Sequence, residues 1–241
     1  MAPIISNELG RLANVIKDQM KSGTETIFFI RRNQGPVGRK VAYGRIITTI
    51  LPQKTVQHRV YLAVGRNLID YPGNVRTPTA DMTTAKLLFN SVVSTPSAKF
   101  MTCNINDIYL NTPIDRYEYM RLPIGMIPKE IIEQYNLLRI MHNGYVYIEI
   151  QKGMYNLSQS ELISNLYLKQ HLTKFGYAPT KHTTGLWRHK SRPITLPLVV
   201  DNFRVKYKGE EHTKNLIKTL ESSYKFNTDW KVELYCIITL K

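Results

Sequence analysis

The sequence is poor in cysteine and in long apolar runs. Its two cysteines, Cys103 and Cys236, are too far apart along the chain for a metal-ligand spacing. The first twelve residues lack the features of a secretory signal, and the longest apolar run, residues 194–200, is far short of the roughly 20 residues of a membrane span. These absences predict a protein of the cytoplasm or nucleus that is not secreted and has no transmembrane segment and no thiolate metal site.

Acidic residues are also scarce. The chain has 33 Lys and Arg against 18 Asp and Glu, a formal net charge of +15 and a pI near 9.7. Such a charge favours a polyanionic partner, and without an apolar span nucleic acid is favoured over a membrane. A hydrophobic content of 43% over 241 residues can bury a real core, in one domain or in two closely packed subdomains.

The first part of the chain reads as a small strand-rich region followed by a helix. A short helix is expected within residues 7–20, and strands over residues 27–31, 41–51 and 59–64. Residues 79–93 change to a helical period with Thr79 as the expected N-cap. The expected apolar face of this helix is formed by Met82, Ala85, Phe89 and Val92.

The remainder alternates between strands and helices. Strands are expected over residues 100–103 and 145–150, and a helix near Ser158, where Ser158 and Glu161 have the spacing of a capping box. Two apolar strands, 194–200 and 203–207, flank Asp201-Asn202 as a tight hairpin. A helix opening at Glu210 and a final strand over 232–240 follow. From residue 100 the order predicts an antiparallel split βαβ (ferredoxin-like) sheet with helices on one face.

Five sequence blocks occur in an order that is more specific than any one of them. They are residues 59–65 with 69–71, residues 104–111, Tyr119-Met120, residues 154–159 and residues 199–202. In this order the blocks resemble those of the reverse transcriptases of copia-type retrotransposons. The resemblance runs from about Glu8 to Lys241.

The resemblance implies an α+β polymerase fold with a fingers subdomain over residues 1–98 and a palm subdomain over residues 99–241. It also implies RNA-directed DNA synthesis on an RNA or DNA template and primer, with deoxynucleotide triphosphates and Mg²⁺. The thumb and RNase H segments of complete elements are not expected within these 241 residues.

The resemblance also implies which residues would carry the chemistry. Nucleotidyl transfer uses two Mg²⁺ ions, which bind carboxylates in preference to amides. Where the family has three aspartates, this chain has Asn104, Asp201 and Asn202, so only Asp201 is an expected metal ligand. Asp107 is not expected to substitute, because alternation along a strand would place it on the opposite face from residue 104. The expectation is therefore a catalytically inactive domain. A residual polymerase, or a non-catalytic protein that binds nucleic acid through a basic primer–template groove, are the alternatives.

Three further residues match nucleotide-binding positions of the family: Arg59 for the triphosphate, Tyr109 as an aromatic gate against the 2′-hydroxyl, and Gln159 in the nucleotide and template pocket. Tyr61 and Asn156 depart from the family's usual Arg and Gly. Without the resemblance, Arg59 reads as a solvated charge and Tyr109 as a packed strand aromatic.

Two other features stay open at this point. The basic stretch 181–192 contains Trp187, which could stack on bases while its neighbours neutralise phosphates, or the stretch could be a solvated loop. The six histidines show no ligand spacing and are interpreted as surface or packing residues.

Overall fold

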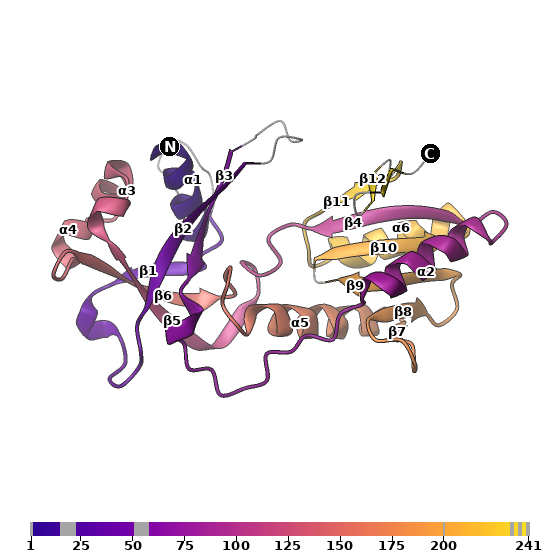
Figure 1. Cartoon of the computed structure of the whole chain (residues 1–241), viewed down its shortest axis with the longest axis horizontal. Helices are drawn as coiled ribbons and strands as arrows, with labels where there is room; N and C mark the ends of the chain where they lie inside the picture. Colours follow the sequence, from indigo (N-terminus) through magenta and orange to yellow (C-terminus); the bar gives the residue numbers. More distant parts are fainter. Residues whose placement is uncertain are drawn as a thin grey trace. The chain divides into compact units, whose positions relative to one another are not determined.

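The computed structural model describes residues 2–14, 23–50, 58–199, 201–231, 234–235 and 238–239, and it is α+β, as predicted (Figure 1). The chain forms two compact units. The first comprises Met1–Val75 and Tyr109–Ile163, and the second comprises Arg76–Ile108 and Ser164–Lys241. This division differs from the consecutive segments 1–98 and 99–241 expected from the sequence, because residues 109–163 supply two strands to the sheet of the first unit.

The first unit is built on a five-stranded sheet of order β1-β6-β5-β2-β3. β2 joins β5 in parallel through two residue pairs, and the other neighbours are antiparallel. Its elements are α1 (Ala2–Leu12), β1 (Ile27–Ile30), η1 (Arg32–Gln34), β2 (Ala42–Ile50), β3 (His58–Val64), η2 (Arg66–Leu68), β5 (Pro113–Pro123), η3 (Ile124–Met126), α3 (Lys129–Gln134), α4 (Leu137–Ile140) and β6 (Tyr145–Lys152).

Alternation along β6 explains how this sheet faces its core. Val146, Ile148 and Ile150 are fully buried, while the residues between them are half-buried, as expected for a strand with one face on the core. The longest strand, β5, is not among the strands expected from the sequence. Pro113 and Pro123 lie at its two ends, where proline costs little in a sheet.

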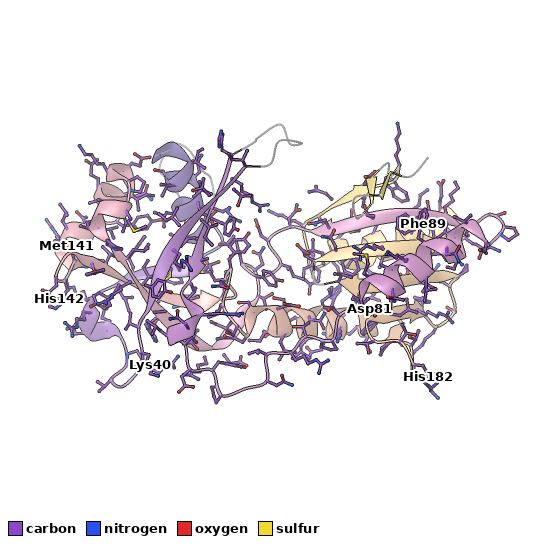
Figure 2. The ribbon with its side chains drawn as sticks, in the orientation of Figure 1. Lys40, Asp81, Phe89, Met141, His142 and His182 are labelled. Atoms are coloured by element: carbon purple, nitrogen blue, oxygen red, sulfur yellow. The ribbon has the colours of Figure 1, made fainter. Side chains whose placement is uncertain are left out.

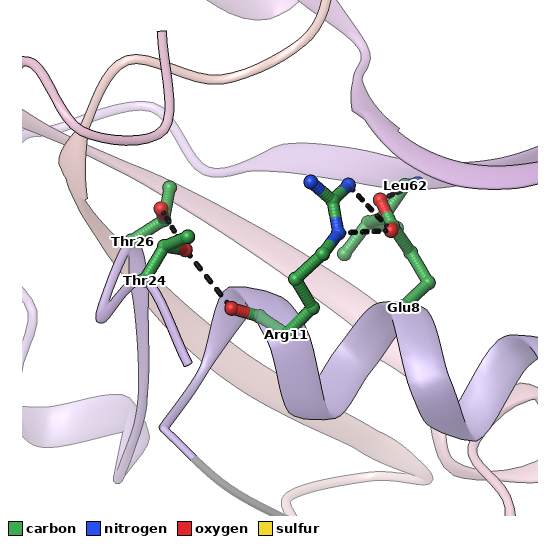
Figure 3. Close-up of polar contacts among 5 residues, drawn as sticks. All are labelled: Glu8, Arg11, Thr24, Thr26 and Leu62. Atoms are coloured by element: carbon green, nitrogen blue, oxygen red, sulfur yellow. Dashed lines mark hydrogen bonds and ion pairs between the residues drawn. The ribbon is translucent and has the colours of Figure 1, made fainter. Parts of the chain in front are cut away.

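Helix α1 is tied to the sheet by a buried carboxylate (Figure 3). Glu8 accepts hydrogen bonds from the Leu62 N–H at 3.2 Å and from Arg11 Nη2 at 2.6 Å. The Thr24 hydroxyl donates to the Arg11 carbonyl at 3.0 Å, which fixes the other end of the helix. The helix begins at Ala2, earlier than expected, and residues 15–20 of the expected range lie outside the described residues.

The second unit contains a six-stranded antiparallel sheet of order β11-β4-β10-β9-β8-β7. In sequence, α5 lies between β4 and β9, and α6 lies between β10 and β11. The four neighbouring strands β11, β4, β10 and β9 therefore have the predicted split βαβ order. The elements are α2 (Met82–Val93), β4 (Lys99–Ile105), α5 (Ser160–Lys174, its first turn grouped with the first unit), β7 (Tyr177–Pro179), β8 (Leu186–His189), β9 (Ile194–Val199), β10 (Asn202–Tyr207), α6 (Glu210–Glu221), β11 (Phe226–Asp229), β12 (Leu234–Tyr235) and β13 (Ile238–Thr239).

The helices of the second unit cover both faces of its sheet. Lys206 on β10 donates to the Ser91 carbonyl of α2 at 2.8 Å, and Phe100 on β4 packs edge-on against Phe89 of α2. The alternate β10 residues, such as Phe203 and Val205, are buried on the other face. In Figure 1, α2 lies in front of the sheet and α6 behind it. The prediction of helices on one face was made for the segment after residue 100, and α2, which precedes that segment, adds a helix to the other face.

Several element ends differ from the predictions. The N-cap of α2 is Asp81 rather than Thr79, because the Asp81 side chain accepts from the Thr84 N–H at 2.7 Å. Helix α5 begins at Ser160, two residues after the expected capping residue Ser158. The strand that completes the sheet is β11, and the expected strand 232–240 is represented by the short β12–β13 pair, with its other residues outside the described ones. None of the helices in the described part of the chain has the length and apolar character needed to cross a membrane.

Candidate functional site

Three asparagines lie side by side across neighbouring strands of the second unit. Asn202 on β10 is the Cα partner of Asn104 on β4, and Asn104 is also the partner of Asn227 on β11. Residues directly opposite each other in antiparallel strands project from the same face, so the three side chains share one side of the sheet. We call Asn202, Asn104 and Asn227 the amide row.

The amide row is linked to Asp201 by hydrogen bonds. Asn104 Nδ2 donates to Asn202 Oδ1 at 3.1 Å, and Asn202 Nδ2 lies 3.4 Å from Asp201 Oδ1, a long contact. The Asp201 carbonyl accepts from the Ile105 N–H at 2.8 Å, which holds the hairpin against the end of β4. Asn104, Asp201 and Asn202 therefore cluster at one end of the central strands, although nearly a hundred residues separate Asn104 from the other two in sequence.

The donor set of this cluster does not fit the two-metal centre that the resemblance implies. Asp201 supplies its single carboxylate, while the Asn202 amide oxygen already accepts from Asn104. Two divalent ions carry four positive charges, and amide oxygens offset far less of that charge than carboxylates do. Across the described residues, no group of three or more His, Cys, Asp and Glu side chains is arranged to hold a metal ion.

Asp107 is positioned by a turn rather than by a strand. Strand β4 ends at Ile105, and Asp107 has a φ of 52°, in the left-handed region that aspartate tolerates. Alternation along a strand therefore says nothing about its direction, and that reason for excluding Asp107 is wrong.

The expected nucleotide-binding residues Arg59, Tyr109 and Gln159 all belong to the first unit. Arg59 is an exposed residue of β3, opposite Thr49 on β2. Two positions further, the Tyr61 ring packs on Tyr155 with 5.3 Å between centroids. Tyr109 is half-buried in a turn, so it is not the strand residue that its sequence context suggested. Its role as a gate stays a prediction.

Gln159 is buried beside a buried carboxylate. Gln159 is 1% exposed and its Nε2 donates to Glu118 Oε1 at 3.3 Å, while Arg39 Nη2 donates to Glu118 Oε2 at 2.8 Å. Within the described residues, Gln159 Oε1 has no hydrogen-bond partner. The side chain therefore helps to satisfy Glu118 inside the first unit, and its part in a nucleotide pocket stays a prediction.

A cavity of about 980 Å³ in the first unit is the feature that sequence reasoning missed. It lies between the β1–β2 connection, β5, β6 and the end of α4, where Figure 2 labels Met141 and His142. We call it the arginine cavity, after the five arginines that line it: Arg31, Arg32, Arg39, Arg121 and Arg139. The first three form a visible basic cluster in the sequence, but only the fold brings Arg121 on β5 and Arg139 on α4 to them.

The basic stretch 181–192 comprises most of the turn between β7 and β8, strand β8 and the residues that follow it. Trp187 pairs with Leu196 on β9 and is 3% exposed, so its ring is packed inside the second unit. The interpretation of Trp187 as a stacking platform for bases is therefore wrong. The charged neighbours Arg188 and Lys190 remain outside, as expected for a solvated hairpin.

No protein-family model matches the sequence, and a comparison with curated proteins gives no match. Function is therefore inferred from the ordered sequence blocks and from the geometry of the chain itself.

Proposed function

We propose that the chain is a reverse-transcriptase domain of the copia type in which metal-dependent DNA synthesis has been lost. The observation that carries the proposal is the pairing of Asn104 with Asn202 beside Asp201, at the hairpin turn of a split βαβ sheet. These are the positions at which the resemblance puts the three metal-binding carboxylates. In this proposal the second unit is the palm, and the first unit is the fingers.

The backbone conformation of Asn156 supports the proposed relationship to copia-type reverse transcriptases. Asn156 stands where the family usually has glycine, and its φ is 66°, a conformation that glycine adopts freely and asparagine tolerates. Its Nδ2 donates to the Val64 carbonyl at 2.8 Å, which stabilises the turn. The backbone conformation that would favour glycine at this position is thus retained without glycine.

The second candidate function is binding of nucleic acid without catalysis. The net charge of +15 and the five arginines of the first-unit cavity favour it. In this function the template and primer are partners, and the loss of the carboxylates has no effect on binding.

Primer extension on an RNA template, with Mg²⁺ or Mn²⁺ and the purified chain, tests the proposal. We expect no extension above the level without protein. Robust extension by the unmodified chain that Asp201→Ala abolishes would overturn it. Binding to a primer–template duplex over a range of salt concentrations then tests the second function, because log K falls by about 0.9 per neutralised phosphate for each tenfold rise in salt.

A further inference from the structure

The arginine cavity has an unusual balance of charge. Five arginines line it together with His142, and no Asp or Glu is among its lining residues. Arg39 is paired with the buried Glu118. The other four have no carboxylate partner in the described part of the chain. These are Arg31, Arg32, Arg121 and Arg139.

Local contacts hold two of these arginines in place. The Arg121 guanidinium lies 4.6 Å from the centroid of the Tyr145 ring, and Arg32 Nη1 lies 2.6 Å from His142 Nε2. Stacking on a ring and bonding to an imidazole orient a guanidinium without neutralising it. Charges gathered on one concave surface repel one another over about 8 Å at physiological ionic strength, so the arrangement favours an anion that bridges them.

The chemistry of the lining favours phosphodiester groups. Planar guanidinium groups donate two parallel hydrogen bonds to a phosphate, and the four unpaired arginines come from three separate segments of the chain. Exposed apolar side chains stand among them, including Val37 and Met141. Charged donors interspersed with apolar contacts suit a chain of phosphates that carries bases. A concave surface fits a flat lipid bilayer poorly.

We propose that the arginine cavity is a binding site for single-stranded nucleic acid, held by its phosphate backbone. The four unpaired arginines are exposed, so the site is open to a polymer rather than closed around a small ligand. β1 and β3 form opposite edges of the sheet, so the β1 side of the cavity is separate from the strand that carries Arg59. The site rests on the second candidate function and deepens it, because it names the surface and the kind of nucleic acid that would bind there. It needs neither the amide row nor polymerase ancestry.

Fluorescence anisotropy with a labelled oligouridine of about ten nucleotides tests this site. The test variant is Arg121→Gln with Arg139→Gln. The matched control is Arg66→Gln with Arg188→Gln, which removes the same charge from exposed arginines outside the cavity. We expect the test variant to bind about tenfold or more weakly, and its slope of log K against log salt to be smaller in magnitude by about 1.4, from roughly 0.7 per lost phosphate contact. The control should bind within about twofold of the unmodified chain.

A second variant, Arg31→Gln with Arg32→Gln, should weaken binding in the same way, and the thermal midpoint of each variant verifies that it is folded. Equal binding by the folded test variants and the unmodified chain would overturn the site, as would an equal loss in the control. Inorganic tripolyphosphate that competes as well as the oligonucleotide, mole for mole, would show a small-phosphate site instead. Cosedimentation with phosphatidylserine vesicles that the test variant loses would show a membrane surface instead. Primer extension tests the proposed function separately, so the two can fail independently.

Discussion

Asn104 and Asn202 lie directly opposite each other on β4 and β10, and the Asn104 amide donates to the Asn202 side-chain oxygen at 3.1 Å. An amide both donates and accepts, so this pair satisfies itself without a cation. Two carboxylates in the same places would repel each other unless a cation lay between them. The pair therefore stabilises the sheet at a point where a metal centre would need carboxylates.

Under the proposed function, introducing both carboxylates should raise primer extension more than introducing either one. We expect Asn104→Asp with Asn202→Asp to extend a primer on the order of 100-fold faster than either single variant, because both groups act on the same pair of metal ions. Tyr61 and Asn156 are untouched, so the double variant should still be slow. Primer extension by the single and double variants measures the coupling, and gains that are simply multiplicative would contradict it.

Asn104→Asp with Asn202→Asp should also change the stability of the chain. Without metal, the double variant should be less stable than the unmodified chain by up to about 1 kcal/mol, because like charges then face each other across β4 and β10. Adding Mn²⁺ should raise its thermal midpoint but not that of the unmodified chain. An equal response to Mn²⁺ in both proteins would mean that the ion binds elsewhere.

The effect of substituting Asn156 on the free energy of unfolding should depend on the backbone conformation at this position. At a φ of 66°, Asn156→Val should destabilise the chain by about 2 kcal/mol, since a β-branched residue is strained there and the bond to the Val64 carbonyl is lost. Asn156→Gly loses the same bond without the strain, so it should cost no more than about 1 kcal/mol. Urea unfolding of the two variants measures the difference, and equal losses would show that the hydrogen bond alone matters.

The cap of α2 should make stability depend on pH. The hydrogen bond from the Thr84 N–H to the Asp81 carboxylate holds the pKa of Asp81 below its ordinary value. A depressed pKa means that the ionised group stabilises the folded state above its unfolded pKa, and that this contribution disappears as the pH falls through the folded pKa. Asp81→Ala should therefore lower the thermal midpoint near neutral pH and much less in acid.

Asp81→Ser is the matched control for the cap, because serine also accepts at an N-cap but does not titrate. The difference in thermal midpoint between Asp81→Ser and Asp81→Ala should stay constant with pH. Figure 2 shows Asp81 at the start of α2, the helix that also carries Phe89. If the decrease in thermal midpoint caused by Asp81→Ala does not change with pH, the carboxylate charge plays no part in the cap.

Cys103 should report unfolding of the second unit. The side chain is 1% exposed on β4, and burial raises the pKa of its thiol to about 12. In a Cys236→Ser background, a maleimide should label Cys103 at least about 1000-fold more slowly in the native chain than in the unfolded one. Fast labelling under native conditions would show that β4 opens locally.

The sequence by itself determined the local pattern of this protein. Alternation along β6 and a period of 3.6 residues in α6 follow from side-chain burial within one segment, so they can be read from the residues. The resemblance carried by the blocks around Asn104 and Asn202 assigns both residues to one site, and the strand pairing brings them together. The residue types there, two amides and one carboxylate, are properties of the sequence alone.

The tertiary structure decided what depends on pairing between distant segments. Residues 109–163 join the first unit because β5 and β6 find their partners in β1 and β2, a choice that no local pattern encodes. Trp187 became a core residue through the β8–β9 pairing, although its basic neighbours suggested an exposed ring. The arginine cavity arises in the same way, because β5 and α4 bring Arg121 and Arg139 to the cluster after β1. Long-range contacts of this kind depend on which strands bury the most apolar surface together, and that is a property of the whole chain.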